Sequence, residues 1–275
     1  MATTLRFFRP LVTLWLILAS GGCFAFGADG HRIVVLIAQN HLSDKTAAAI
    51  NDIVNYDDLS ELSVWPDKIR HLPNWRQSRY WHYASIDDGE QFSDFNRHSD
   101  GDVLSALGYF YKQLQNPELG KQQRRESLLF FSHFVADIHQ PLHVGRRADR
   151  GGNAITVKWP DQNKTVNLHQ VWDSLILNTA NKTPRQYSRY LVRRQDQHNN
   201  LHIKPWRQSQ FVDWARESKA LRHQVYGFAQ PQQTRGTLTT DYIERSKTIL
   251  EQRLLIAGLR LADYLNRIFD PDGQE

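Results

Sequence analysis

The chain has 275 residues, of which 40% are hydrophobic and 23% are charged, and it contains a single cysteine. This length allows a full hydrophobic core, and one cysteine excludes a disulfide-rich scaffold. The formal net charge of +5 is compatible with a polyanionic ligand, but it is far below that of a dedicated nucleic-acid-binding domain with a clustered basic face.

Residues 1–25 are typical of a secretory signal peptide. Two arginines precede an apolar run from Leu11 to Ala19, and Cys23-Phe24-Ala25 ends in an acceptable small-residue cleavage site. The apolar run is too short to anchor the chain in a membrane. We therefore expect a secreted or periplasmic protein in which residues 26–275 form one domain.

Cleavage after Ala25 would remove two arginines and no acidic residue, so the formal net charge would fall from +5 to +3. It would also remove Cys23, which leaves a domain that its core alone must hold together in an oxidising compartment. This combination favours a bacterial periplasm. A lipoprotein anchored at Cys23 is the alternative, although Ser20 stands where such signals usually have leucine.

The first part of the mature chain is expected to be helical. An apolar helix over residues 33–38 begins where a glycine-containing segment stops, and His31 lies at its start. Ser43 can cap a second helix that runs to residue 54. The acidic residues 57–61 are expected to form a solvated loop.

The next helix begins at a proline. Pro66 fixes its start, which places Asp67 in the first turn and Arg70 one turn later, so that both side chains can face one spot. An N-terminal carboxylate with a local ion pair is the structural alternative. His82 follows within an aromatic cluster, and a helix capped by Asp102 is expected to run to residue 114.

A strongly apolar helix then carries His133 and Asp137 four residues apart on one face, the spacing at which two side chains can hold one divalent ion. His139 and His143 repeat this spacing, but Pro141 lies between them and is expected to bend or end the helix. Buried aspartate and histidine must be paired or bound to metal. A helical core that satisfies these groups with hydrogen bonds is the alternative.

Residues 155–159 and 165–168 alternate in polarity across a polar turn and predict a β-hairpin. The hairpin leads into His169 and Asp173, which are again four residues apart and stand at the start of another apolar helix.

The rest of the chain is expected to be helical. Residues 206–226 contain a helix, residues 230–236 form a loop, and residues 241–269 form a long amphipathic helix. The pattern predicts an all-α fold, a mostly helical single domain with a small β-hairpin.

The inward-facing candidates are all histidines and aspartates: His31, Asp67, His82, His133, Asp137, His143, His169 and Asp173. Imidazole and carboxylate ligands favour zinc over calcium or magnesium, which take mainly oxygen ligands. An open catalytic zinc takes about three protein ligands, so eight side chains indicate more than one ion.

Six motifs occur in an order that resembles the S1/P1-type zinc-dependent nucleases and 3′-nucleotidases, which share a superfamily with bacterial zinc-dependent phospholipase C. The motifs are Phe26-Gly27 with Gly30-His31, Trp65-Pro66-Asp67 with Arg70, Trp81-His82-Tyr83, His133 and Asp137 with Gln140-Pro141-Leu142-His143, Gly151-Gly152-Asn153, and Asn167-Leu168-His169 with Trp172-Asp173. The resemblance implies three zinc ions at the base of a cleft in a mostly α-helical domain.

The resemblance also implies how the ligands are divided. Asp67, His82, His133 and Asp137 would hold one zinc ion, and Asp137 would bridge to a second ion. The second ion would take His31 together with the amino group and carbonyl oxygen of Phe26, the residue exposed by cleavage. The third ion would take His143, His169 and Asp173. His139 is not a ligand in this pattern.

In the family pattern, the ions activate a water molecule for attack on phosphorus and stabilise the leaving oxygen. Asp67 and Asp137 would act at the catalytic centre, Arg70 would bind the phosphoryl oxygens, and Tyr83 would stack a base. Asn153 would contact the substrate.

The resemblance thus implies an enzyme that hydrolyses the phosphodiesters of single-stranded DNA and RNA to 5′-phosphorylated products and also acts on 3′-nucleotides. We expect a monomer without stable membrane association. A zinc-dependent phospholipase C is the nearest alternative, since the same ions would attack a phospholipid diester. A zinc-binding protein without catalytic activity is the other, supported only by Phe26 where the family usually has tryptophan.

Overall fold

The computed structural model describes residues 26–93, 95, 97–160, 164–198, 209–228 and 234–274. The signal-peptide prediction for residues 1–25 lies outside these ranges. Within them the chain is mostly α-helical with one small sheet, which confirms the predicted fold class. None of the described helices is both long and apolar enough to cross a membrane.

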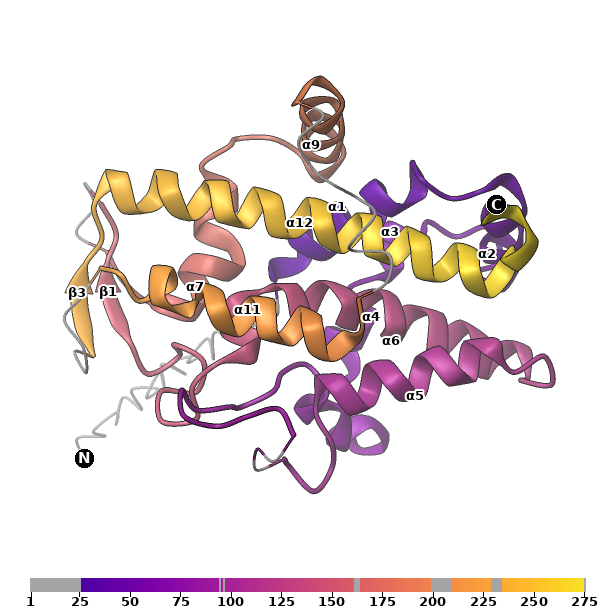
Figure 1. The fold of residues 1–275 in the computed structure, drawn as a ribbon, viewed down its shortest axis with the longest axis horizontal. Helices are drawn as coiled ribbons and strands as arrows, with labels where there is room; N and C mark the ends of the chain where they lie inside the picture. Colours follow the sequence, from indigo (N-terminus) through magenta and orange to yellow (C-terminus); the bar gives the residue numbers. More distant parts are fainter. Residues whose placement is uncertain are drawn as a thin grey trace, which may run out of the picture.

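The helices and helical turns follow one another with short connections. They are α1 (Gly27–Gln39), α2 (Asp44–Ile53), α3 (Leu59–Leu62), α4 (Trp65–Ile69), η1 (Pro73–Tyr80), α5 (Val103–Gln115), α6 (Lys121–His139), η2 (Pro141–Val144), α7 (Leu168–Gln170), η3 (Val171–Leu175), α8 (Ile176–Asn178), α9 (Pro184–His198), α11 (Phe211–Val225), α12 (Thr240–Phe269) and η4 (Pro271–Gln274). Figure 1 shows α5, α6, α11 and α12 running roughly along the long axis, with the sheet near one end.

The centre of the fold is α6. Its residues from Ser127 to His139 are all buried, because α5, α11 and α12 pack around it. Three phenylalanines of this helix, Phe130, Phe131 and Phe134, are fully buried within an aromatic cluster. A helix that is apolar on every side belongs in a core, as its sequence predicted.

The close packing of α1 on α12 depends on a glycine. A Cβ atom at Gly258 of α12 would lie 2.5 Å from the side chain of Ile37 and 2.9 Å from the carbonyl oxygen of Val34, both in α1. This contact brings α1, which carries His31, against the longest helix of the domain.

The predicted hairpin is confirmed as β1 (Thr156–Lys158) and β2 (Thr165–Asn167), which pair antiparallel with Val157 opposite Val166. A third strand, β3 (Arg235–Thr237), pairs parallel with β1 and completes the order β2-β1-β3. The loop expected over residues 230–236 is therefore wrong at its end, and its first part, residues 230–233, lies outside the described ranges. Three residues are too few for a periodic signal, and the pairing comes from a distant part of the chain.

Two other expectations need correction. Asp58, expected in a solvated loop, caps α3, since its Oδ1 accepts hydrogen bonds from the backbone N–H and hydroxyl of Ser60. The first helix begins at Gly27, before its expected start. Within its first turns, a Cβ atom at Gly30 would lie 2.8 Å from the ring of Phe26. The absent side chain at Gly30 lets that ring pack on the helix.

The helix α9 was not predicted from the sequence. It contacts α1 and buries Tyr187 and Leu191, while most of its other described side chains are more exposed. Ser188 is buried as well, so only two of the buried residues described in this helix are apolar, which is a weak periodic signal. The helices expected over residues 206–226 and 241–269 are confirmed as α11 and α12, with small shifts of their ends.

Candidate metal centre

The structure brings all eight predicted metal-ligating side chains together, and each residue is at most 6% exposed. They come from six separate parts of the chain: His31 from α1, Asp67 from α4, His82 after η1, His133 and Asp137 from α6, His143 from η2, and His169 and Asp173 from α7 and η3. Pro141 ends α6 as expected and starts the 3₁₀ turn that carries His143.

Three groups among these residues have ligand atoms within 4.8 Å of one another. The groups are His31, His133 and Asp137; Asp67, His82 and His133; and His143, His169 and Asp173. The third is the set expected from the resemblance. In the other two, His133 is the shared member, whereas the family pattern gave Asp137 as the bridge.

Asp137 nevertheless lies at the centre of the cluster. Its Oδ2 atom is 3.2 Å from Nε2 of His133 and 3.1 Å from Nδ1 of His82. Its Oδ1 atom is 3.2 Å from Nδ1 of His143 and 3.6 Å from Nε2 of His31. One carboxylate therefore contacts histidines of all three groups, a position from which it can bridge two ions.

Backbone carbonyl groups fix the orientation of three imidazoles. Nδ1 of His133 donates a 2.7 Å hydrogen bond to the carbonyl oxygen of Ser63, and Nδ1 of His143 donates one of 2.8 Å to that of His82. Nδ1 of His169 donates a 2.6 Å hydrogen bond to the carbonyl oxygen of Gly151. A carbonyl oxygen only accepts, so each Nδ1 carries a proton, and Nε2 is the nitrogen of each ring that would bind a metal ion once it is deprotonated.

The carboxylates are poised to be ionised. Burial by itself would raise the pKa of Asp137, but His133 and His143 outweigh it and hold that pKa well below its ordinary value. Burial also opposes ionisation of Asp173, whereas His169 and His143 lower its pKa to about 2. The same carboxylates raise the pKa of His143 to about 9 against the effect of its burial. The charged forms of these buried side chains are therefore stabilised by the opposite charges of their neighbours.

The buried carboxylate of Asp67 has few polar contacts among the described residues. Within the described ranges, neither of its buried carboxylate oxygens accepts a hydrogen bond, although Nη1 of Arg70 lies 3.2 Å from Oδ1. Nε2 of His82 and Nε2 of His143 are also buried without a hydrogen-bond partner in this part of the structure. A buried carboxylate with so few partners is costly unless a cation binds it. The donor set, nitrogen and oxygen without thiolate, fits divalent metal ions.

The local helix around Asp173 is irregular. The expected single apolar helix is divided into α7, the π-helical turn η3 and α8. The turn sets Oδ2 of Asp173 3.1 Å from Nε2 of His169. Such π-turns occur frequently at functional sites.

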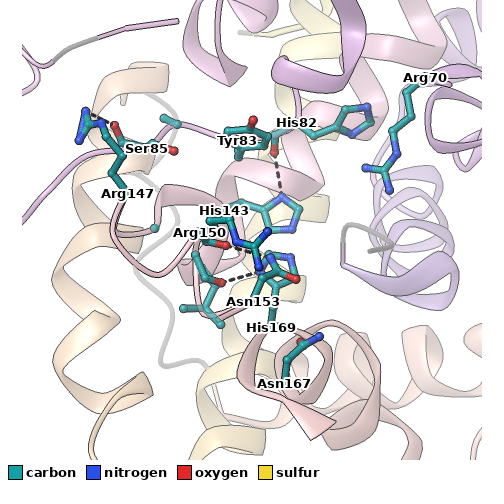
Figure 2. Close-up of a pocket in the computed structure, with 14 residues that line it drawn as sticks. Arg70, His82, Tyr83, Ser85, His143, Arg147, Arg150, Asn153, Asn167 and His169 are labelled. Carbon is teal, nitrogen blue, oxygen red and sulfur yellow. Dashed lines mark hydrogen bonds between the residues drawn. The ribbon is translucent and has the colours of Figure 1, made fainter. Parts of the chain in front are cut away.

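A pocket of about 580 Å³ opens above the cluster. Figure 2 shows His82, His143 and His169 among the residues that line it, with Arg70 on one side. Tyr83 and Asn153, expected to contact the substrate, also line it, and Tyr83 is 38% exposed. The pocket thus joins the metal groups, a guanidinium and an open aromatic ring.

His139 lies apart from the metal groups, as expected. Its Nδ1 donates a 2.7 Å hydrogen bond to the carbonyl oxygen of Val135, and its Nε2 accepts one of 2.8 Å from Arg260. Burial, with Arg253 and Arg260 nearby, holds its pKa well below the ordinary value, so the ring is neutral. Both nitrogens are satisfied without a metal.

Phe26, expected to supply ligands through its backbone, is 1% exposed and packs its ring on Gly30, next to His31. A Cβ atom at Gly27 would lie 2.7 Å from the carbonyl oxygen of Asp173, so the start of the domain adjoins the third metal group.

Several residues around the site had no role predicted from the sequence. Gln140 is fully buried and donates a 2.8 Å hydrogen bond to Oδ1 of Asp173. Ser85, Arg147 and Arg150 line the pocket. Gln140 stands inside the Gln140-Pro141-Leu142-His143 motif, which was the available signal; the other three carried none.

Comparisons with known proteins identify the family of this chain. The sequence model described as S1/P1 Nuclease matches residues 26–270. Endonuclease 4 of Arabidopsis thaliana is 34% identical, over 98% of this chain and 97% of its own length. Nuclease P1 of Penicillium citrinum is 26% identical, over 88% of this chain and 97% of its own length. Among solved structures, the alpha-toxin of Clostridium perfringens has a TM-score of 0.48 at 16% identity, over 92% of this chain and 66% of that chain. The matched family spans almost the whole described domain, and the chain belongs to the S1/P1 nuclease family.

Proposed function

We propose that this protein hydrolyses phosphodiester bonds of single-stranded DNA and RNA to give 5′-phosphorylated products, and that it also releases phosphate from 3′-nucleotides. The observation that carries the proposal is the convergence of three buried His/Asp groups, two of which reach a pocket through His82, His143 and His169. Arg70 and Tyr83 line the same pocket. Family membership supports the same reaction.

Arg70 is placed to bind the phosphoryl group. Its side chain is 22% exposed, it lines the pocket, and its Nη1 is held 3.2 Å from Oδ1 of Asp67. A guanidinium stays charged at any working pH and offers several donors in one plane. Its interaction with the phosphoryl oxygens therefore strengthens as negative charge develops on them in the transition state.

Tyr83 accounts for the preference for single strands. Its side chain is partly exposed in the pocket, and Tyr83 is the next residue in the sequence after His82. A base that stacks on this ring would therefore lie beside the metal groups. Stacking tolerates any base but requires one that is unpaired. Asn153, whose side-chain amide donates a 2.9 Å hydrogen bond to the carbonyl oxygen of Arg150, lines the opposite part of the pocket.

We propose zinc as the metal in all three groups, because imidazole and carboxylate ligands without thiolate are typical of catalytic zinc. When bound, zinc lowers the pKa of a coordinated water and stabilises negative charge on phosphate oxygens. The chain itself directs Nδ1 of His133, His143 and His169 to backbone carbonyl oxygens, which leaves Nε2 of each ring for a metal ion. It also lowers the pKa values of Asp137 and Asp173, which favours their ionised form.

The activity is tested by incubating the purified mature protein with single-stranded oligodeoxynucleotide, RNA and phosphatidylcholine in parallel, with and without a chelator. We expect cleavage of both nucleic acids, 5′-phosphate ends by mass spectrometry, and loss of cleavage on chelation. Cleavage of phosphatidylcholine alone would identify a phospholipase C, and inactivity on all three substrates would favour a non-catalytic zinc protein.

We also propose that signal cleavage after Ala25 completes the site of a secreted or periplasmic monomer. A free amine at Phe26 can bind a metal ion, whereas a preceding residue would turn that amine into an amide without an available lone pair. N-terminal sequencing should find Phe26, and one alanine placed before it should reduce zinc content and nuclease activity. Full activity of that extended protein would contradict the proposal and favour the lipoprotein alternative at Cys23.

A further inference from the structure

A second pocket, of about 210 Å³, adjoins the metal pocket. Tyr83, Ser85 and Arg147 line both pockets. Figure 2 shows Ser85 and Arg147 on the side of Tyr83 that faces away from Arg70. Tyr83 therefore stands between two adjoining hollows, and only one of them lies over the metal groups.

The second pocket has an aromatic stack in its wall. The rings of Tyr80 and His98 are stacked with centroids 3.5 Å apart and an interplanar angle of 16°. The guanidinium of Arg79 lies 4.5 Å from the centroid of the Tyr80 ring. His98, whose side chain is 41% exposed, is the accessible member at the pocket, so a further planar group can extend the stack on its ring.

The segment that carries His98 is anchored to the domain. Nε1 of Trp81 donates a 2.7 Å hydrogen bond to the carbonyl oxygen of Asp100. The backbone N–H of Val103 donates one of 3.2 Å to the carbonyl oxygen of Tyr83. These contacts hold the segment of His98 in place relative to Tyr83 before any ligand binds. Such preorganisation reduces the entropic cost of binding.

Two arginines line the second pocket, and they differ in their partners. Nη1 of Arg147 is 2.8 Å from Oδ2 of Asp87 and 3.1 Å from a carboxylate oxygen of Glu90, so two acidic groups balance its charge. Arg97 has a side chain that is 45% exposed, and among the described residues its ion pair is a 3.6 Å approach of Nε to Oδ2 of Asp102. Arg97 is therefore the cation that remains accessible to an anionic ligand.

We propose that this second pocket binds the nucleotide next to the one held over the metal groups, on the same single strand. His98 stacks its base, and Arg97 pairs with its phosphate. The pocket is smaller than the roughly 300 Å³ at which sites for drug-sized ligands begin. It therefore suits the base of this nucleotide, while the sugar and phosphate remain outside it. The proposal rests on the proposed nuclease function and adds a subsite that favours polynucleotides over mononucleotides.

The kinetic test compares thymidine 3′-phosphate, which fills only the metal pocket, with a trithymidylate, which can reach both pockets. The readout is the kcat/KM for the trithymidylate divided by that for the mononucleotide. His98→Ala should lower this ratio about fivefold or more, as expected for the loss of one stacked base. His223→Ala is the matched control, because His223 is an exposed histidine that lines neither pocket.

Binding is tested separately from catalysis, so that failure of the proposed function does not hide the result. The metal-loaded protein is titrated into a labelled phosphorothioate tetrathymidylate, which resists cleavage, and anisotropy is measured at several salt concentrations. His98→Ala should weaken binding about fivefold or more. Arg97→Ala should reduce the slope of log affinity against log salt by about 0.7, the value for one phosphate contact on a single strand.

An unchanged kinetic ratio together with unchanged oligonucleotide affinity in both variants would overturn the proposal. Equal losses on the mononucleotide and the trithymidylate would also overturn it, because the pocket would then act through the metal site. If the wild type hydrolyses neither substrate, the proposed function fails, and the anisotropy measurements still decide whether the second pocket binds a single strand.

Discussion

The side-chain amide of Gln140 donates a 2.8 Å hydrogen bond to Oδ1 of Asp173, while its carbonyl oxygen accepts one of 2.5 Å from the backbone N–H of Leu142. Gln140 thereby connects the turn that carries His143 to another ligand of the same metal group. Partners of this kind orient a metal ligand and raise metal affinity.

Gln140→Leu should lower zinc affinity in the group of His143, His169 and Asp173 by about 10–100-fold. Competition with a chelator of graded strength should release about one zinc ion per chain more easily than from the wild type. Gln122→Leu, an exposed glutamine on the same helix as His133, should leave zinc release unchanged. Equal release from all three proteins would show that Gln140 does not support the site.

Arg70 and Tyr83 are predicted to affect different kinetic constants. Arg70→Ala should lower kcat by roughly 100-fold, since its interaction strengthens as charge develops. Tyr83→Ala should mainly raise KM, because base stacking is present before the reaction begins. Steady-state kinetics on single-stranded DNA with parallel zinc analysis checks both. If Arg70→Ala lost zinc, the guanidinium would be supporting Asp67 rather than the substrate.

The pH dependence of stability should reveal the ion pairs of Glu217. Burial opposes ionisation of this residue, but Arg260 and Arg253 outweigh it and hold its pKa below the ordinary value of 4.5. Because the folded-state pKa is the lower one, the stabilisation is complete above the unfolded value and is lost as pH falls through the folded-state value.

Urea unfolding of chelator-treated wild type and Glu217→Gln, at pH values from about 7 to 3, tests this directly. The free-energy difference between the two proteins should be constant at the upper end and shrink below the unfolded-state pKa of 4.5. A difference that grows on acidification would have the wrong sign for an ionised Glu217.

Some features of the fold and the site have a local sequence signal, and others depend on contacts between distant parts of the chain. The spacing of His133 and Asp137 on an apolar helix, and the helix end at Pro141, follow from local rules that need no partner. The small strand β3 depends on pairing with β1, far away in the chain, and leaves little local signal. The contact of Gln140 with Asp173 required the structure for the same reason.

The division of ligands among the ions also exceeds what spacing can predict. Spacing identifies pairs within one element, such as His169 and Asp173. The approach of His31 to His133, whose rings stack with centroids 3.7 Å apart, depends on how α1 packs between its neighbours. That packing depends in turn on Gly258, whose role is set by a contact and not by any motif.

Gly258→Ala should destabilise the fold by about 1–3 kcal/mol, because the added methyl group would overlap the side chain of Ile37. Gly108→Ala is the matched control in another helix: a Cβ atom at that position meets no other atom within 4 Å. It should stabilise α5 by about 0.5–1 kcal/mol. Urea unfolding checks both changes, and equal effects at the two positions would contradict the close packing of α1 on α12.

The most direct test of the whole account is the zinc content of the purified mature protein, measured by elemental mass spectrometry before and after chelation. The three His/Asp groups predict about three zinc ions per chain, with hydrolysis of single-stranded DNA lost on chelation and restored by added zinc. The same measurement on Asp137→Asn should show more than one ion lost, because that carboxylate contacts histidines of every group. One ion per chain in the active wild type, or calcium in place of zinc, would contradict the account.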